Sequence, residues 1–296
     1  MSKTKAAQKA KARVRRTRGQ ELWHQFKKNK GAIVGLVVFS IVILIAIYAQ
    51  IAYDYTTDIT KLNPLQMLQK PSAAHPFGTD HMGRDVMARV FYGARYSILI
   101  GLGAVALATS VALVIGSIAG YYGGKFDNLL MRMVDIFMVI PALLIVLIIV
   151  SVLGVSLPNL IIGLSIGTIP VSTRQVRAAI LPVRNSEFVE AAKAIGVPDW
   201  RIIVTHVIPN SMSTIIVNTT MRIGSTIVSA AGYSFLGLGV PTPMPEWGAM
   251  LSDARSLMLD YPSLVLFPGL AILITAMSIN LIGDGLRDAL DPKLRR

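Results

Sequence analysis

The chain has 296 residues, of which 53% are hydrophobic and only 15% charged, and it contains no cysteine. Because about a quarter of the residues in an ordinary soluble domain are charged, this composition indicates an integral membrane protein. The lack of cysteine excludes disulfides, thiolate metal sites and cysteine nucleophiles. We therefore expect an all-α, polytopic fold.

The first 30 residues form a basic tail. They hold eleven Lys and Arg against Glu21 alone, which supplies +10 of the net charge of +13. A basic segment before a first membrane span resists translocation, so the tail predicts a cytoplasmic N-terminus. Nucleic-acid binding is the alternative, but no recognition motif accompanies the basic run. The apolar stretch that follows is too long for a cleaved signal peptide, so we expect it to remain as an anchor.

Runs of uncharged residues predict the membrane spans, because a helix needs roughly 20 apolar residues to cross the hydrocarbon layer. The first span takes residues 31–53, an extracytoplasmic loop follows at 54–95, and the remaining spans lie within 96–292. One run is of double length, and Gly154-Val-Ser-Leu-Pro158 marks the turn between its two helices. Six spans result. The runs are 32–52, 96–124, 136–173, 223–245 and 261–283.

The distribution of charge between the loops supports this topology. Five basic residues lie in the inner segment 174–201, whereas the outer loop 237–262 has Arg255 against three acids. The outer loop 54–95 disagrees, since it holds five basic and four acidic residues, but long loops obey the positive-inside rule poorly. Both termini are therefore predicted to be cytoplasmic.

The inner loop 174–210 predicts a short surface helix. Good helix formers run from Ser186 to Gly196, with Phe188, Ala191, Ala192 and Ile195 at helical spacing on one face. Gly196 supplies a stop, and Pro198-Asp199 suits the first turn of a second helix. An ordinary interfacial amphipathic helix would share this pattern, so the residues alone leave both readings open.

Several motifs in this chain resemble one family of transporters. Glu190-Ala191-Ala192, followed by Gly196 and Ile208-Pro209, resembles the EAA loop of bacterial ABC-importer permeases. His206 departs from the family pattern, which commonly has isoleucine two positions before Leu-Pro. Further segments resemble the dipeptide, oligopeptide and nickel branch. They are His75-Pro-Phe-Gly-Thr-Asp-His-Met-Gly-Arg-Asp85, Gly93–Ser97, Gly237–Gly239, Pro243, Pro245-Glu-Trp-Gly248 and Asn280–Pro292.

The resemblance implies a type I ABC importer permease fold with six transmembrane helices in the bacterial plasma membrane. It implies a subunit that forms half of a pathway for dipeptides or oligopeptides, with a nickel or other small-solute importer as the alternative. The implied partners are a homologous second permease, two ATP-binding ATPase subunits and an extracytoplasmic solute-binding protein. In this family the EAA helix transmits the closure of the two ATPase subunits to the membrane helices. The implied coupling residues are Glu190, Ala191, Ala192, Gly196, Ile208 and Pro209.

The chain lacks the motifs of an enzyme. Its nearest likeness to a phosphate-binding loop, residues 119–126, has Ala119 in place of the first glycine and Phe126 in place of the hydroxyl residue. We therefore predict a non-catalytic subunit without a cofactor, with ATP and Mg²⁺ bound by the partner ATPases. Gly116, Gly120 and Gly124 are instead typical of a small-residue face for close helix packing.

The histidines do not predict a metal site. The four of them fall on different sides of the predicted membrane. His75 and His81 share one loop, where a structural role in the family-like turn is the favoured reading.

One charged residue falls deep within a predicted span. If the fifth span starts near Asn210, at the end of the inner loop 174–210, Arg222 lies about 12 residues deeper, roughly 18 Å into the membrane. Such residues usually face the bundle interior or a water-filled cavity. Our hypothesis is that Arg222 lines the substrate path and attracts a carboxylate, and an internal pair or a hydrogen-bonded packing contact is the alternative.

Few other ionisable groups lie inside the spans, which argues against the rival class, an ion-coupled secondary transporter. Asp127, Arg132 and Asp135, at the start of the third span, are expected to make a structural pair or an interhelix contact.

Overall fold

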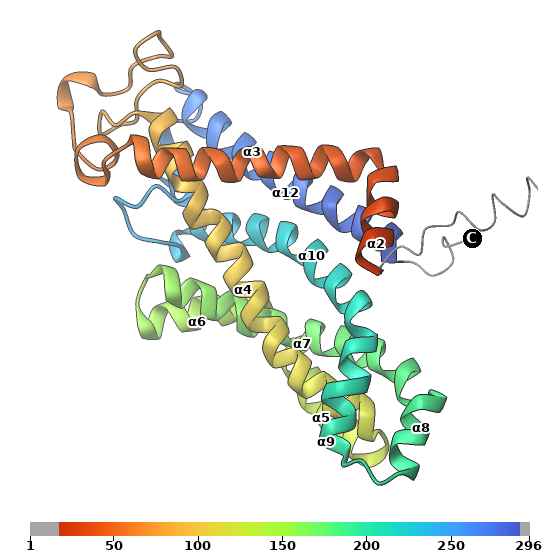
Figure 1. Cartoon of the computed structure of the whole chain (residues 1–296). Coiled ribbons are helices and arrows are strands. Elements are labelled where there is room, and N and C mark those ends of the chain that lie inside the picture. The colour runs from red at the N-terminus through yellow and green to blue at the C-terminus, as the bar shows by residue number, and fades with distance from the viewer. Residues whose placement is uncertain (1–17, 291–296) are drawn as a thin grey trace, which may run out of the picture.

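The computed structural model describes residues 18–290, and long helices packed side by side make up most of this part (Figure 1). Besides helices it contains one isolated bridge, between Thr79 and Asp85. The predicted all-α fold is therefore confirmed. The basic residues of the predicted tail from Lys3 to Arg16, and residues 291–296, lie outside the described residues. The longer helices are α2 (Arg18–Lys28), α3 (Lys30–Ala52), α4 (Val86–Tyr122), α5 (Gly124–Val139), α6 (Ala142–Leu153), α7 (Leu157–Arg184), α10 (Ile208–Tyr233) and α12 (Ser263–Leu290).

Shorter helical segments connect or cap these helices. Three are short α-helices, and the others are single π or 3₁₀ turns. They are η1 (Tyr55–Ile59), η2 (Pro64–Gln66), α8 (Glu187–Ala194), α9 (Asp199–Ile202), η3 (Ile203–Val207), η4 (Ser234–Leu238), α11 (Trp247–Asp253) and η5 (Arg255–Leu257).

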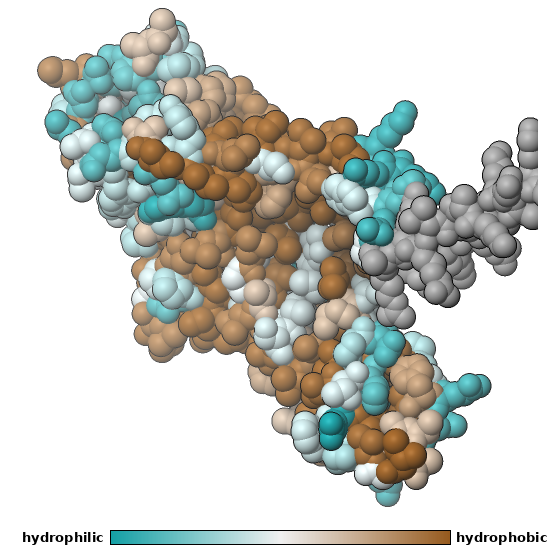
Figure 2. Space-filling view, in the orientation of Figure 1, coloured by the Kyte–Doolittle hydropathy of each residue, from teal (hydrophilic) through white to brown (hydrophobic). Residues whose placement is uncertain are grey.

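The six predicted spans correspond to α3, α4, the α5–α6 pair, α7, α10 and α12. Among the described residues, α3, α4 and α12 are each long and apolar enough to cross a membrane, and the bent α5–α6 pair makes a fourth candidate. Helices α7 and α10, of 28 and 26 residues, are long enough but more polar. Figure 2 shows the corresponding brown belt between hydrophilic ends.

Helix α4 begins ten residues before the charge-free run that predicted its start. Asp85 caps it, with its carboxylate accepting from the Ala88 N–H at 2.8 Å. Its first turns contain two arginines that find partners inside the protein. The Arg89 guanidinium donates to the Ile59 carbonyl at 2.9 Å, and the Arg95 guanidinium lies over the rings of its neighbouring tyrosines. The predicted loop 54–95 thus includes the start of a helix.

The third span is broken. Helices α5 and α6 meet at Ile140-Pro141 and are bent by 79°, because a proline cannot continue the hydrogen-bond ladder of the helix before it. The predicted turn at Gly154 is confirmed. Gly154 has a φ of 88°, which ends α6, and the Ser156 hydroxyl caps α7.

Helices α4 and α7 lie in close contact along much of their length (Figure 1). A Cβ on Gly116 would lie 2.8 Å from the Thr173 carbonyl oxygen, and one on Gly120 would lie 2.9 Å from the Ile180 Cβ. The predicted small-residue face is therefore confirmed at these two glycines. It does not extend to Gly124, which faces open space and takes a positive φ at the start of α5.

Two ends of the bundle carry the features relevant to function. We call the end formed by residues 53–85 and 240–262 the loop end, and the opposite end, which holds α2, α8 and α9, the α8 end. Helix α3 runs from the α8 end to the loop end, and α4 runs back. Single continuous helices, α3 and α4, therefore connect the two ends.

Candidate functional site

Helix α8 lies on the ends of α4 and α7. Val189 and Ala192, on one face of α8, are 0% and 5% exposed and join a hydrophobic cluster with Ile180 of α7 and Tyr121 of α4. The cluster also takes in Ile202, just after the turn. A short helix gains most of its stability from such packing, so α8 is held in place by its buried face.

Large apolar side chains are exposed along α8, the turn after it, α9 and the start of η3. Phe188, Ile195, Trp200 and Val204 are 45%, 80%, 67% and 56% exposed. Of the four apolar residues predicted on one face, only Ala192 is buried, so that set does not form the face that packs on the protein. Exposed apolar side chains gathered at one surface are typical of a protein–protein interface.

The predicted turn residues hold α8 and α9 at a fixed angle. Gly196 has a φ of 78°, where L-residues with a Cβ are strained, and the Val197 N–H returns to the Ala192 carbonyl at 3.1 Å. The predicted second helix, α9, follows this turn, with Asp199 in its first turn and Pro198 one residue earlier, at the N-cap position. The Tyr121 hydroxyl donates to Asp199 at 2.7 Å, which ties the turn to α4.

The remaining residues of the predicted coupling loop divide between the two faces. Glu190 and Ala191 are exposed, whereas Ile208 is half-buried where the π turn η3 leads into α10. Pro209 occupies the first turn of α10, where a missing N–H costs nothing. His206, the departure from the family pattern, lies in η3, and its carbonyl accepts from the Asn210 side chain at 2.6 Å.

A cavity of about 610 Å³ lies between α7, α10 and α12. Among residues 18–290, the cavity is lined by two arginines and by no carboxylate. The other eight lining residues are uncharged, and five of them are polar. They are Gln175, Ser213, Thr214, Val217, Asn218, Met221, Ser225 and Leu290. A cavity with this lining suits a hydrated anionic or polar solute better than a lipid chain.

Arg222 lies in the wall of this cavity, about 21 Å along α10 from Ile208. Its guanidinium donates to the Gln175 side-chain oxygen at 2.9 Å and makes no ion pair with any residue in 18–290. The hydrogen-bonded packing contact that was the alternative reading is therefore present. It leaves four N–H donors of the guanidinium for other partners. Arg287, the second cation, is exposed on the α12 side of the cavity.

Charged residues of α5 contact α7, as one of the two readings of Asp127 and Asp135 predicted. The Arg177 guanidinium donates to both oxygens of the buried Asp127 carboxylate, at 2.6 and 2.5 Å. Arg174 also pairs with Asp135, through a single carboxylate oxygen and in a more exposed position. These two ion pairs, the first of them bidentate, fix the broken span to the helix that also carries Gln175.

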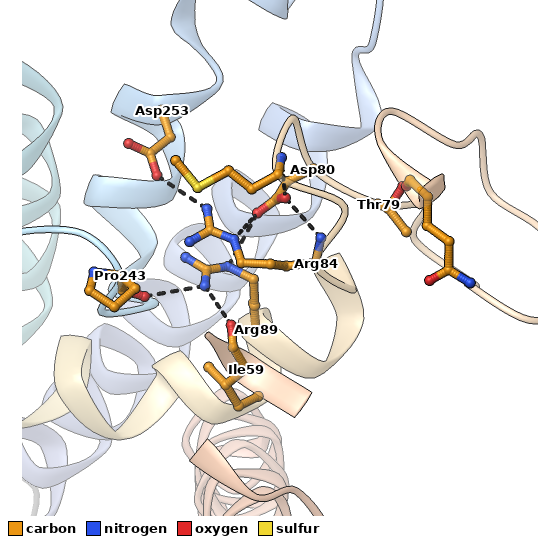
Figure 3. Close-up of polar contacts among 9 residues, drawn as sticks. Ile59, Thr79, Asp80, Arg84, Arg89, Pro243 and Asp253 are labelled. Atoms are coloured by element: carbon orange, nitrogen blue, oxygen red, sulfur yellow. Dashed lines mark hydrogen bonds and ion pairs between the residues drawn. The ribbon is translucent and has the colours of Figure 1, made fainter. Parts of the chain in front are cut away.

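A buried charge cluster at the loop end was missed from the sequence. Figure 3 shows Arg84 and Arg89, both about 1% exposed, converging on Asp80. The Arg84 Nε lies 2.7 Å from the Asp80 carboxylate, and its Nη2 lies 3.7 Å from Asp253. The pKa of the Asp253 carboxyl is raised above its ordinary value, mainly because the group is partly buried. The cluster ties the loop that precedes α4 to α11.

Among the described residues, no three His, Cys, Asp or Glu side chains lie together in a way that could hold a metal ion. The His75 Nδ1 lies 2.7 Å from the Asp85 carboxylate, so it contacts the residue that caps α4. This contact agrees with the structural reading of His75.

The helical bundle, its broken third span and its polar cavity define a multi-pass membrane protein of the transporter type. Residues 112–296 match the family of binding-protein-dependent transport system inner membrane components, and residues 17–71 match the N-terminal transmembrane domain of oligopeptide transport permease C. The chain belongs to the ABC importer permeases, as its motifs predicted.

Curated relatives match almost the whole chain. A dipeptide transport system permease protein of Alkalihalophilus pseudofirmus is 46% identical over 93% of this chain and 90% of its own length. A glutathione transport system permease protein of Pectobacterium atrosepticum is 39% identical over 95% of this chain and 93% of its own length.

A solved structure shares the fold. A chain of the inward-facing MetNI methionine ABC transporter has a TM-score of 0.58 and 18% identity, over 70% of this chain and 98% of its own. This likeness supports the type I importer fold.

Proposed function

We propose that this chain forms half of the translocation pathway of an ATP-driven importer of short peptides. The observation that carries the proposal is the polar cavity between α7, α10 and α12, with the Arg222 guanidinium held at membrane depth and not neutralised within residues 18–290. A cation in such a place is costly unless it serves a solute or a partner. The dipeptide and glutathione permeases to which the chain is similar point to peptides as substrates.

Arg222 recognises a substrate carboxylate in this proposal, such as a peptide C-terminus. A charge-assisted hydrogen bond contributes about 1.5–3 kcal/mol, or roughly a ten- to hundred-fold change in transport efficiency. Arg222→Gln should therefore reduce uptake of a dipeptide with a free C-terminus by that factor and leave its C-terminally amidated form little affected. Uptake by the complete importer in proteoliposomes measures both. Arg287→Gln, at the exposed second cation, is the control, and equal uptake of both peptides in all variants would contradict the role.

The exposed side of α8 is the docking surface for an ATPase subunit in this proposal. Its buried face is anchored on α4 and α7, so a partner that binds Glu190, Ala191 and the exposed apolar side chains can displace those helices. Such a partner shifts the permease only if its two nucleotide states bind α8 differently. Gly196 allows the turn, while Ile208 and Pro209 carry the displacement into α10.

Glu190→Lys should abolish co-purification of the ATPase subunits while the permease remains inserted in the membrane. Asp260→Lys makes the same change of charge at an exposed acid of the loop end and should leave ATPase binding intact. Co-purification followed by ATP-dependent uptake measures both steps. If Glu190→Lys retains the ATPase and transports normally, α8 is not the coupling surface.

The complete importer comprises a homologous second permease, two ATPase subunits that bind ATP and Mg²⁺, and an extracytoplasmic solute-binding protein. The α8 end faces the cytoplasm, with both termini there, and the loop end faces the binding protein.

Reconstitution tests the mechanism. Uptake that requires ATP hydrolysis by the partners supports it, whereas uptake driven by an ion gradient alone would assign the chain to the secondary transporters. Competition between dipeptides and Ni²⁺ in the same assay separates peptide from nickel transport.

A further inference from the structure

One hydrogen bond in the wall of the polar cavity joins a charged side chain to a neutral one. The Arg222 guanidinium of α10 donates to the Gln175 side-chain oxygen of α7 at 2.9 Å. Both side chains are half-buried, and both line the cavity. Charged residues inside a membrane bundle usually pair with one another, so a neutral acceptor at this position needs an explanation.

Helix α7 is fixed close to Gln175. Its neighbours Arg174 and Arg177, three residues apart and so on one face, pair with Asp135 and Asp127 of α5. Gln175 follows Arg174 by about 100° around the helix, which turns its side chain away from α5. The two ion pairs therefore set the rotation of α7 and the place from which Gln175 reaches α10.

Helix α10 is likewise fixed where it carries Arg222. Gly224 packs so closely on α12 that a Cβ there would lie 2.6 Å from the Asn280 side-chain oxygen. A Cβ on Gly283 of α12 would lie 2.8 Å from the Met221 Cγ, next to Arg222 in the chain. Both helices are thus held by other contacts, and the remaining freedom belongs to the long Arg222 side chain itself.

The surroundings of the pair are polar but contain no counter-charge. Gln175, Asn218 and Arg222 line the polar cavity and also a much smaller cavity, to which Thr109 of α4 and Ser172 of α7 contribute. Within residues 18–290, neither lining includes a carboxylate. The guanidinium therefore meets no negative group in either cavity, and its charge stays available to a solute.

We infer that Gln175 is a positioning residue, which directs the Arg222 guanidinium into the polar cavity without neutralising it. In this way Gln175 sets the preference of this half of the pathway for substrates with a free carboxylate, so the inference rests on the proposed role of Arg222. A free arginine side chain samples many rotamers, and a hydrogen bond that selects one of them reduces the entropy lost on binding. A carboxylate at position 175 would also orient the guanidinium, but it would occupy two N–H groups and cancel the charge.

Gln175→Glu separates the positioning of a free cation from packing. The substitution keeps the shape of the side chain and strengthens the contact between α7 and α10, but it neutralises Arg222. We measure uptake of a dipeptide with a free C-terminus and of its amidated form by the complete importer in proteoliposomes. The ratio of the two should fall roughly ten- to hundred-fold, as for Arg222→Gln, while the thermal stability of the importer is not lowered. A contact that only joins two helices predicts an unchanged ratio.

Gln175→Met removes the acceptor and keeps the length of the side chain. The guanidinium then keeps its charge but loses its orientation, so KM for the free dipeptide should rise roughly three- to tenfold, the range of one hydrogen bond, with little change in the maximal rate. Uptake of the amidated dipeptide should stay the same. In an Arg222→Gln background, neither substitution of Gln175 should lower the ratio further, because no guanidinium is left to position.

Gln50→Glu is the matched control. The Gln50 side-chain oxygen, on the exposed surface of α3, accepts from the Arg95 guanidinium at 3.2 Å, and neither residue lines the two cavities. The same substitution against an arginine outside the pathway should leave both the ratio and KM unchanged.

The outcomes separate Gln175 from the proposed role of Arg222. If Arg222→Gln lowers the ratio and neither Gln175→Glu nor Gln175→Met alters it, Gln175 has no positioning role, although Arg222 still binds the carboxylate. Equal losses of free and amidated uptake in both Gln175 variants would likewise reduce the contact to packing. If Arg222→Gln also leaves the ratio unchanged, recognition by Arg222 and positioning by Gln175 are both overturned.

Discussion

Replacing Asp80 by asparagine tests whether the buried charge cluster holds the loop end together. One oxygen of Asp80 accepts the N–H groups of Met82 and Arg84 at 2.8 and 3.0 Å, and asparagine can keep these bonds. The other oxygen faces the Arg84 Nε at 2.7 Å and the Arg89 Nε at 3.6 Å. An amide NH₂ at that position would place a hydrogen-bond donor against the two Nε–H donors of Arg84 and Arg89. Two buried guanidinium groups then lose their shared counter-charge (Figure 3).

Removing one partner of a buried ion pair costs about 3–5 kcal/mol, because the remaining charge stays desolvated. We expect this loss in the local stability of residues 60–85, where the Asn63 and Thr79 N–H groups bond across the loop at 3.0 and 3.1 Å. At about 1.4 kcal/mol per tenfold change, hydrogen exchange at these amides should accelerate by roughly 10²–10⁴-fold.

Asp253→Asn provides the comparison within the same cluster. Asp253 lies 3.7 Å from Arg84 and is 26% exposed, so its ion pair is weaker and better solvated. We expect about 1 kcal/mol or less, a change of roughly fivefold in exchange at the same amides. Mass-spectrometric hydrogen exchange on the purified chain measures both variants. Less than about tenfold acceleration in Asp80→Asn, or equal effects of the two substitutions, would refute the reasoning.

Two glycines yield further predictions. Gly120→Leu should lower the thermal stability of the purified chain by about 1–3 kcal/mol, because its Cβ would lie 2.9 Å from the Ile180 Cβ, while Gly103→Ala, with 3.4 Å to its nearest neighbour, should change little. Gly196→Val should weaken ATPase co-purification more than Gly196→Asn, because asparagine tolerates a φ of 78° better than a β-branched residue and no neighbour crowds the position. Equal losses from Val and Asn would contradict a backbone origin.

The sequence predicted the helices well wherever a local rule determines them. Asn29 caps α3 and Ala52 ends it, within one residue of the predicted span. It predicted the start of α4 less well, because charge was taken as the sign of a helix end. Arg89 lies within α4 because it reaches the carbonyls of Ile59 and Pro243, 30 and 154 residues away along the chain. No rule based on local charge anticipates such partners.

The candidate sites show the same division. The depth of Arg222 follows from counting residues along one helix, so its place inside the bundle was predictable. Its partner Gln175 lies 47 residues earlier, on α7, and only the packing of α7 against α10 brings the two together. The face of α8 that packs inward could not be predicted from the sequence for a related reason. Val189 is buried because α8 lies on Ile180 and its neighbours, which the spacing of residues within α8 does not reveal.

Helix α4 connects the two ends of the bundle in the proposed mechanism. It runs unbroken for 37 residues, about 55 Å, and contains no proline, whereas α7 and α12 contain Pro170, Pro182 and Pro268 within their length. One end of α4 carries Arg89 and contacts Trp247, and the other end holds the α8–α9 turn through Tyr121. A continuous helix with contacts at both ends transmits a displacement of one end to the other by tilting. Movement of α8 by an ATPase should therefore reach α11 directly. Helix α7 should move together with α4, because the two helices pack closely at Gly116 and Gly120.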